Sequence, residues 1–195
     1  MEELETKINE NIKTILSEHR YMHSIGVMEK AGELAEYYGL DINKARAIGL
    51  AHDIAKQMSK EETKEYVEEY GIELDEIELL NTSLIHAKIG ADICKREYDF
   101  DEQMVNAIKY HTTGNPKMDL MAKIIFMADK IEENRHYIGI ERRRELTLKD
   151  IDMAIIETID YTTQYCIEKN ELIHPDSINT RNYLLKIKKE NKINN

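Results

Sequence analysis

The sequence predicts an all-α protein, because apolar residues recur at helical spacing along most of the chain and helix-breaking residues are rare. Only two prolines and eight glycines occur among 195 residues, of which 42% are hydrophobic and 33% charged. These proportions are ordinary for a helical protein. A chain of this length can bury a sizeable core, so we expect a single domain over residues 1–195, with a core from about 17 to 185 and a frayed C-terminal tail.

Ser and Asp residues mark where helices begin, because their side chains accept hydrogen bonds from the free N–H groups of a first turn. Ser17 and Asp41 precede the second and third predicted helices. Ser59 with Glu62 predicts a capping box for the fourth, and Asp101 opens the seventh. In order, the predicted helices cover residues 2–16, 18–38, 42–53, 60–70, 75–80, 86–97, 102–111, 119–132, a short helix within 133–146, 148–169, and a last helix in or after the segment HPDSI.

Glycine and proline mark where helices end. Gly39 ends the second helix, and Gly114 with a proline two residues later stops the seventh. Pro175 breaks the chain before the last helix, for which Asp176 or Ser177 is the predicted cap. No internal repeat, low-complexity tract or linker separates these elements, which favours one domain.

Charge and hydropathy exclude several classes of function. Lys and Arg number 27 against 38 Asp and Glu, for a net charge of −11, whereas nucleic-acid backbones are bound by clustered positive charge. We therefore expect no nucleic acid polymer as a partner. The N-terminus MEELETKINE lacks the apolar core of a signal peptide, and no apolar run approaches the roughly 20 residues of a membrane helix. We expect a cytoplasmic protein without membrane contact.

The stretch GLAHDIAK, residues 49–56, carries the strongest chemical signal. His52 and Asp53 stand together in an apolar run, and a buried imidazole and carboxylate are costly unless they are paired or bind a metal. His23 and Asp129 also lie in apolar helical segments. This pattern of His, His-Asp and Asp on successive helices resembles the HD phosphohydrolase superfamily, and it predicts that these four residues hold one metal ion.

Two imidazoles and two carboxylates leave about two positions of an octahedron for water and a substrate oxygen, and such mixed ligands favour iron, manganese, cobalt or zinc over calcium. A metal-bound water becomes hydroxide near neutral pH. Phosphate oxygens then need positive charge or donors, for which Lys56, His86, His111 and Arg135 are candidates. Each also has an ordinary structural explanation at a helix end. Asp53 could act as a general base rather than only as a ligand.

A closer resemblance covers nearly the whole chain after residue 15. The stretches RYMHS, GLAHDIAK, HAKIGA, YHTTG, ADKIEENR and IHPDSINTRNYL together resemble the bacterial YqeK family, whose members are symmetrical bis(5'-nucleosyl)-tetraphosphatases. The resemblance implies a helical HD-domain bundle with a metal, commonly iron, between helices. It implies metal ligands at His23, His52, Asp53 and Asp129. From their chemistry, we expect catalytic roles for Asp53, Lys56, His86 and His111. The resemblance implies nucleotide contacts from His23, His86, His111, Thr112, Asp129, Arg135, Ile173, Pro175 and Asn182.

The leading functional hypothesis is an enzyme that cleaves diadenosine tetraphosphate symmetrically into two ADP, with a metal-bound hydroxide as the nucleophile. Its expected partners are a dinucleoside polyphosphate substrate and a nucleoside diphosphate product, and a homodimer is also considered. A second hypothesis is a nucleoside monophosphate or deoxynucleotide phosphatase that uses the same site. A third is a nucleotide-binding regulator whose metal site is no longer hydrolytic. Analysis of the products separates the first two, and tight binding without turnover would indicate the third.

Overall fold

The computed structural model describes residues 2–193, in which every regular element is a helix, so the predicted all-α class is confirmed. None of these helices has the length and hydropathy that a membrane span requires. The elements are α1 (Glu2–Ile15), α2 (Glu18–Tyr38), α3 (Ile42–Ala51), α4 (Lys60–Tyr70), α5 (Glu76–Leu80), the 3-10 helix η1 (Thr82–Leu84), α6 (His86–Tyr98), α7 (Glu102–Tyr110), α8 (Leu120–Ile131), α9 (Ile140–Lys149), α10 (Ile151–Lys169) and α11 (Pro175–Ile193).

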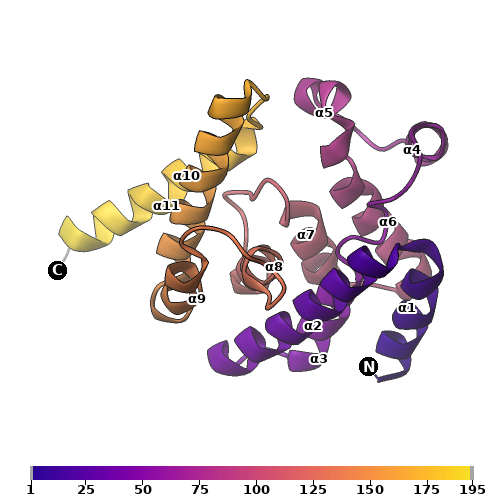
Figure 1. Ribbon diagram of the computed structural model, residues 1–195, viewed down its shortest axis with the longest axis horizontal. Helices are drawn as coiled ribbons and strands as arrows, with labels where there is room; N and C mark the ends of the chain where they lie inside the picture. The colour runs from indigo at the N-terminus through magenta and orange to yellow at the C-terminus, as the bar shows by residue number, and fades with distance from the viewer. Residues whose placement is uncertain (1, 194–195) are drawn as a thin grey trace.

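Helix α8 is the centre of the bundle. It packs against α2 and α3 on one side, and against α7, α9 and α10 on others, and Figure 1 shows it between these groups. Most of its side chains are buried, including Ile124, Ile125 and Met127, which have no exposed surface. The packing of α8 therefore fixes the position of Asp129, which lies in its last turn.

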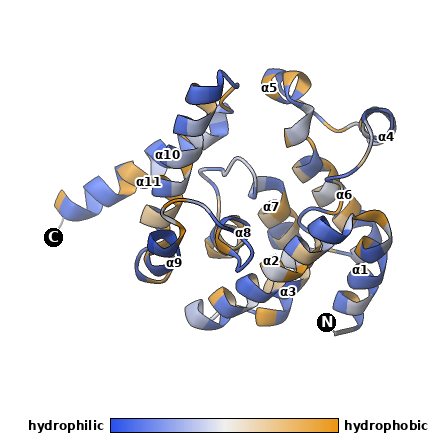
Figure 2. Cartoon of the chain, viewed as in Figure 1, coloured by the Kyte–Doolittle hydropathy of each residue, from blue (hydrophilic) through white to orange (hydrophobic). Residues whose placement is uncertain are grey.

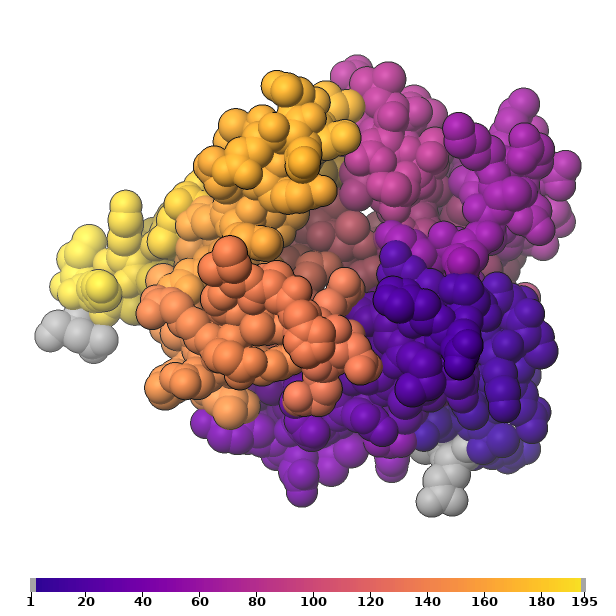
Figure 3. Space-filling model, in the orientation of Figure 1, coloured from indigo at the N-terminus to yellow at the C-terminus, as the bar shows by residue number. Residues whose placement is uncertain are grey.

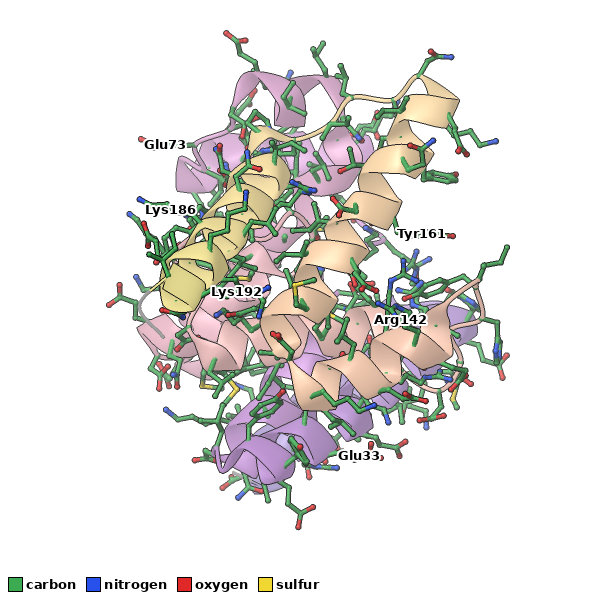
Figure 4. All side chains as sticks on the ribbon, turned by 90° about the vertical axis from the view of Figure 1, so that its left-hand side faces the viewer. Glu33, Glu73, Arg142, Tyr161, Lys186 and Lys192 are labelled. Carbon is green, nitrogen blue, oxygen red and sulfur yellow. The ribbon has the colours of Figure 1, made fainter. Side chains whose placement is uncertain are left out.

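The outer helices are amphipathic or polar. Helices α4 and α9 are mostly hydrophilic in Figure 2, and α4 has no fully buried residue. Figure 4 shows α10 and α11 side by side, with Tyr161 on the first and Lys186 and Lys192 on the second. A small apolar cluster around Ala55, Ile85 and Ile89 attaches α4 to α6.

Most predicted helix starts are confirmed. The side chain of Asp41 accepts a hydrogen bond from the N–H of Lys44, and Ser59 and Glu62 form the complete capping box. Asp101 caps α7 as expected. Ser17 precedes α2, but its side chain accepts no hydrogen bond from the helix.

The C-terminal third departs from the sequence predictions. The predicted cap at Asp176 or Ser177 is wrong, because α11 begins at Pro175 and the His174 ring accepts a hydrogen bond from the N–H of Asp176. Proline suits a first helical position, where no N–H is needed. The predicted helix over 148–169 is divided, because α9 continues to Lys149 and Asp150 caps α10. Helix α11 continues to Ile193, through most of the segment for which we expected fraying. Asn194 and Asn195 lie outside the described residues, and the single domain over 1–195 stays a prediction.

Gly49 allows α3 to lie unusually close to α2. A Cβ at this position would be 2.9 Å from the carbonyl oxygen of Val27 and 2.9 Å from the Cα of Met28. Both are backbone atoms of α2, which cannot move aside as a flexible side chain can. Gly49 therefore fixes the separation of the two helices that carry His23 and His52.

Replacing Gly49 by Ala should destabilise the protein by about 1–3 kcal/mol, the usual cost of overpacking. This cost exceeds the roughly 0.5–1 kcal/mol that Ala gains over Gly within a helix. Thermal unfolding should show a melting temperature lower by about 2–4 °C for each kcal/mol. Gly32→Ala is the matched control, because its Cβ would meet only the Arg46 and Ile42 side chains. If G49A melts at or above the wild-type temperature, the close approach does not constrain the fold.

Candidate metal centre

The four predicted metal ligands come together where α2, α3 and α8 meet. His23 lies in α2, His52 is the C-cap of α3 with Asp53 next to it, and Asp129 lies in the last turn of α8. Their exposed fractions are 5%, 0%, 3% and 5% respectively. Four groups of this polarity are thus held almost entirely out of water.

His52 has the orientation of a metal ligand. Its Nδ1 lies 2.7 Å from the carbonyl oxygen of Gly49, to which it donates its proton. The other ring nitrogen, Nε2, is buried and has no hydrogen-bond partner. A buried polar atom without a partner costs free energy, and its lone pair points among the carboxylates of Asp53 and Asp129, at 3.6 and 3.9 Å. A bound cation would satisfy all three groups.

His86 and His111 repeat this arrangement on α6 and at the end of α7. Each Nδ1 lies 2.7 Å from a carbonyl oxygen three residues earlier, that of Ser83 or Ile108. Their Nε2 atoms are 3.2 Å apart, and that of His86 is 3.2 Å from Oδ1 of Asp53. Two lone pairs and a carboxylate at this distance repel one another unless a proton or a metal ion lies among them.

Glu132 orients His23. Its Oε1 lies 3.1 Å from Nδ1 of His23, whose Nε2 faces Oδ1 of Asp129 at 3.1 Å. A carboxylate behind a ligand imidazole fixes the ring and its tautomer. The sequence prediction missed Glu132, although its position three residues after Asp129 places it on the same side of the helix end.

The ligand atoms form two groups that share His52. His23, His52 and Asp129 make one, and His52, Asp53 and His111 make the other, with the ligand atoms of each group within 4.8 Å of one another. The donors are nitrogen and oxygen, which suits a first-row transition metal. These buried clusters therefore fit the metal that HD domains bind.

Burial and mutual contact set the protonation states. Burial lowers the pKa of His52 to about 4 and also lowers those of His86 and His111, so these imidazoles are neutral near pH 7. Burial alone would raise the pKa of Asp53, but interaction with His52 and hydrogen bonds with His111 and His86 hold it below its ordinary value. Neutral imidazole and ionised carboxylate are the forms that bind metals.

Four cationic side chains border the cluster. Arg20 contacts Oδ2 of Asp53 at 3.0 Å, and Lys130 and Arg135 contact the two oxygens of Asp129 at 2.5 and 2.8 Å. The Nζ of Lys56 lies 3.2 Å from Nδ1 of His86, and burial lowers its pKa. The sequence prediction included Lys56 and Arg135 but not Arg20, which lies one turn before His23 on the same helix face.

The predicted nucleotide contacts are only partly brought together. The Thr112 hydroxyl lies 3.1 Å from Nε2 of His111, and Thr112 lines a cavity of about 130 Å³ with Lys130 and Ile173. Pro175 is exposed at the start of α11, and Asn182 is exposed on that helix, where it accepts a hydrogen bond from Arg181. The surface is hollowed between α10, α5 and α2, as Figure 3 shows.

Comparisons with known proteins agree with this geometry. The HD domain family matches residues 20–134, which contain all four predicted ligands. The chain is 41% identical over 175 residues to a symmetrical bis(5'-nucleosyl)-tetraphosphatase of Halalkalibacterium halodurans, covering 89% of this chain and 93% of the relative. It is 39% identical to the protein of the same name in Bacillus subtilis, covering 89% and 94%.

A solved structure has the same fold. The crystal structure of a predicted HD superfamily hydrolase involved in NAD metabolism from Clostridium acetobutylicum superposes with a TM-score of 0.89 and 38% identity, covering 93% of this chain and 96% of the other. The buried His and Asp cluster, the family match and these relatives lead to one conclusion. The chain belongs to the HD-domain hydrolases, within the YqeK family of the symmetrical bis(5'-nucleosyl)-tetraphosphatases.

Proposed function

We propose that this hydrolase cleaves diadenosine tetraphosphate symmetrically into two ADP. The names of the relatives from Halalkalibacterium halodurans and Bacillus subtilis support the substrate class. The observation that carries the proposal is the buried, unpartnered Nε2 of His52 at the junction of two ligand groups. Four cationic side chains border this cluster: Arg20, Lys56, Lys130 and Arg135. Metal-assisted phosphate hydrolysis uses a metal site with positive charge beside it.

His23, His52, Asp53 and Asp129 are the proposed ligands of a transition metal, with iron as the first candidate. When bound, such an ion acidifies water and neutralises charge on phosphate oxygens. Two contacts within the protein orient the proposed ligand rings. The carbonyl oxygen of Gly49 accepts a hydrogen bond from Nδ1 of His52, and the carboxylate of Glu132 contacts Nδ1 of His23, so each Nε2 faces the centre. His52 is already neutral near pH 7, because burial lowers its pKa. Burial also acts to lower the pKa of His23, but hydrogen bonds with Asp129 and Glu132 outweigh it and raise that pKa, so metal binding would displace a proton from His23.

The bordering cations are proposed to hold the phosphate chain. Arg135 has a planar fork that can contact two oxygens at once, and it is half-exposed beside Asp129, so a substrate can reach it. His86, His111 and Thr112 face the same space from α6 and the end of α7. The proposed product ADP leaves with negative charge, which Lys56 and Lys130 are placed to stabilise.

One nucleoside is proposed to bind in the cavity that Ile173 lines. Phe126, Ile159 and Ile173 give it apolar walls, and Thr112 connects it to the histidines. Contacts from Pro175 and Asn182 stay predictions. The localisation in the cytoplasm and the homodimer also stay predictions.

His23→Ala should remove the bound metal and the activity together, because it deletes one of the proposed ligands and the contact of that ligand with Oε1 of Glu132. Metal content of the purified protein, measured by mass spectrometry, checks this without relying on turnover. His19→Ala is the matched control, since His19 lies one turn earlier on α2 and is exposed. If H23A retains full metal content, His23 is not a ligand.

Hydrolysis of diadenosine tetraphosphate should give ADP alone. We expect the metal centre to hold one of the two central phosphorus atoms, so that the link between them breaks and each adenosine keeps two phosphates. Reaction in oxygen-18 water followed by chromatography and mass spectrometry should find the label in ADP. Labelled ATP or AMP would show asymmetric cleavage and refute the specific activity. Release of inorganic phosphate from nucleoside monophosphates, with diadenosine tetraphosphate left intact, would favour a nucleotide phosphatase.

Arg135→Ala should lower kcat/KM by about 10- to 100-fold, since a hydrogen bond to a charged group contributes about 1.5–3 kcal/mol. Its metal content should stay that of the wild type. Steady-state kinetics and metal analysis of the same preparations measure both. Arg142→Ala is the control, because Arg142 pairs with Glu157 on an exposed face of α9 and α10. An R135A enzyme with wild-type kinetics would exclude this phosphate contact.

A further inference from the structure

A second, larger groove lies on the other side of η1 from the nucleoside cavity. Its volume is about 590 Å³, within the range of small-molecule sites. Residues of and next to η1 separate the two spaces: Asn81 and Leu84 line the nucleoside cavity, whereas Thr82 and Ser83 line the groove. Its other wall is α4, which Figure 1 shows beside α5 and α6.

The groove is connected to the metal centre through Lys56. This side chain lines the groove, and its Nζ lies 3.2 Å from Nδ1 of His86. It also lies 3.5 Å from the carbonyl oxygen of Ser83, the same atom that accepts the Nδ1 proton of His86. The charged end of Lys56 therefore lies at the boundary between the histidines and the groove.

The charge of the groove is opposite to that of the molecule. The chain has a net charge of −11, yet Lys56, Lys60 and Lys64 line the groove against one carboxylate, Glu68. Lys64 pairs with Glu68, whereas Lys60 forms no ion pair with any described residue. Anions are the ligands that such a lining attracts.

The groove also offers an apolar wall of the kind that a nucleobase needs. Met58, Val67, Leu74 and Leu79 contribute to it. Leu79 lines the groove and is 64% exposed, so most of its apolar surface is uncovered by the described chain. Apolar surface beside cations suits a ligand with a flat base and phosphates.

We propose that this groove binds the second nucleotide half of the dinucleotide, with its base against Leu79 and Val67 and its phosphates toward Lys56 and Lys60. The inference rests on the proposed function. It adds a binding site for the nucleotide half that does not occupy the cavity lined by Ile173. A cavity of about 500 Å³ beside His23 and Arg135 is the rival location. Among the described residues that line it, Met22 is the single apolar side chain, so a base would find far less apolar contact there.

The test compares Leu79→Glu with Leu80→Glu. Both leucines are exposed on α5, at 64% and 74%, but only Leu79 lines the groove. Each variant is assayed on diadenosine tetraphosphate and on adenosine 5'-tetraphosphate, which lacks the second nucleoside. L79E should lose at least about tenfold in kcat/KM on the first substrate and little on the second, whereas L80E should match the wild type on both. Thr63→Trp, which fills the groove from α4, should repeat the L79E result.

The outcomes separate the inference from the proposed function. If L79E and T63W keep wild-type kinetics, or lose equally on both substrates, the groove does not bind the second nucleoside. A selective loss in Met22→Glu instead would assign that nucleoside to the rival cavity and overturn the inference. A metal-loaded wild-type enzyme that does not cleave diadenosine tetraphosphate at all would refute the proposed function itself.

Discussion

The hydrogen bond from Nδ1 of His52 to the carbonyl oxygen of Gly49 is the contact on which the centre depends. It fixes which ring nitrogen carries the proton and so leaves Nε2 as a buried lone pair without a hydrogen-bond partner. Because His52 is fully buried at the end of α3, the ring can hold this orientation only while α2, α3 and α8 stay packed. The stability of the bundle and the chemistry of the centre are therefore coupled.

The same device recurs in three other histidines. His86 and His111 donate to carbonyl oxygens three residues earlier, and His23 has Glu132 behind it. Each ring thus turns its Nε2 toward the carboxylates of Asp53 and Asp129. No ring would need to reorient when a metal ion binds. Preorganisation of this kind lowers the cost of assembling the site. The centre is accordingly built from backbone carbonyls at helix ends as much as from side chains.

Much of this structure follows from sequence periodicity. Buried helices require apolar residues every three to four positions, so polar residues such as His52 and Asp129 within these runs stood out as functional candidates. Arg20 and Glu132 did not, because exposed and helix-end positions carry charged residues for many reasons. The division of α9 from α10 and the start of α11 at Pro175 depend on tertiary contacts, which local propensity does not contain. Asn182 was proposed from family resemblance, but it is exposed on α11 and is not among the residues that line the cavity.

Three helices end at the metal centre: His52 caps α3, His111 caps α7, and Asp129 lies in the last turn of α8. The carboxyl end of a helix carries partial negative charge. The backbone therefore adds its partial negative charge to that of Asp53 and Asp129 and favours a cation at the centre itself, whereas Arg20, Lys56, Lys130 and Arg135 supply positive charge at its border. We therefore expect the metal ion to bind independently of substrate, and the phosphates to bind between that ion and the bordering cations. We therefore expect the supply of metal, as well as the supply of substrate, to set the activity of this protein.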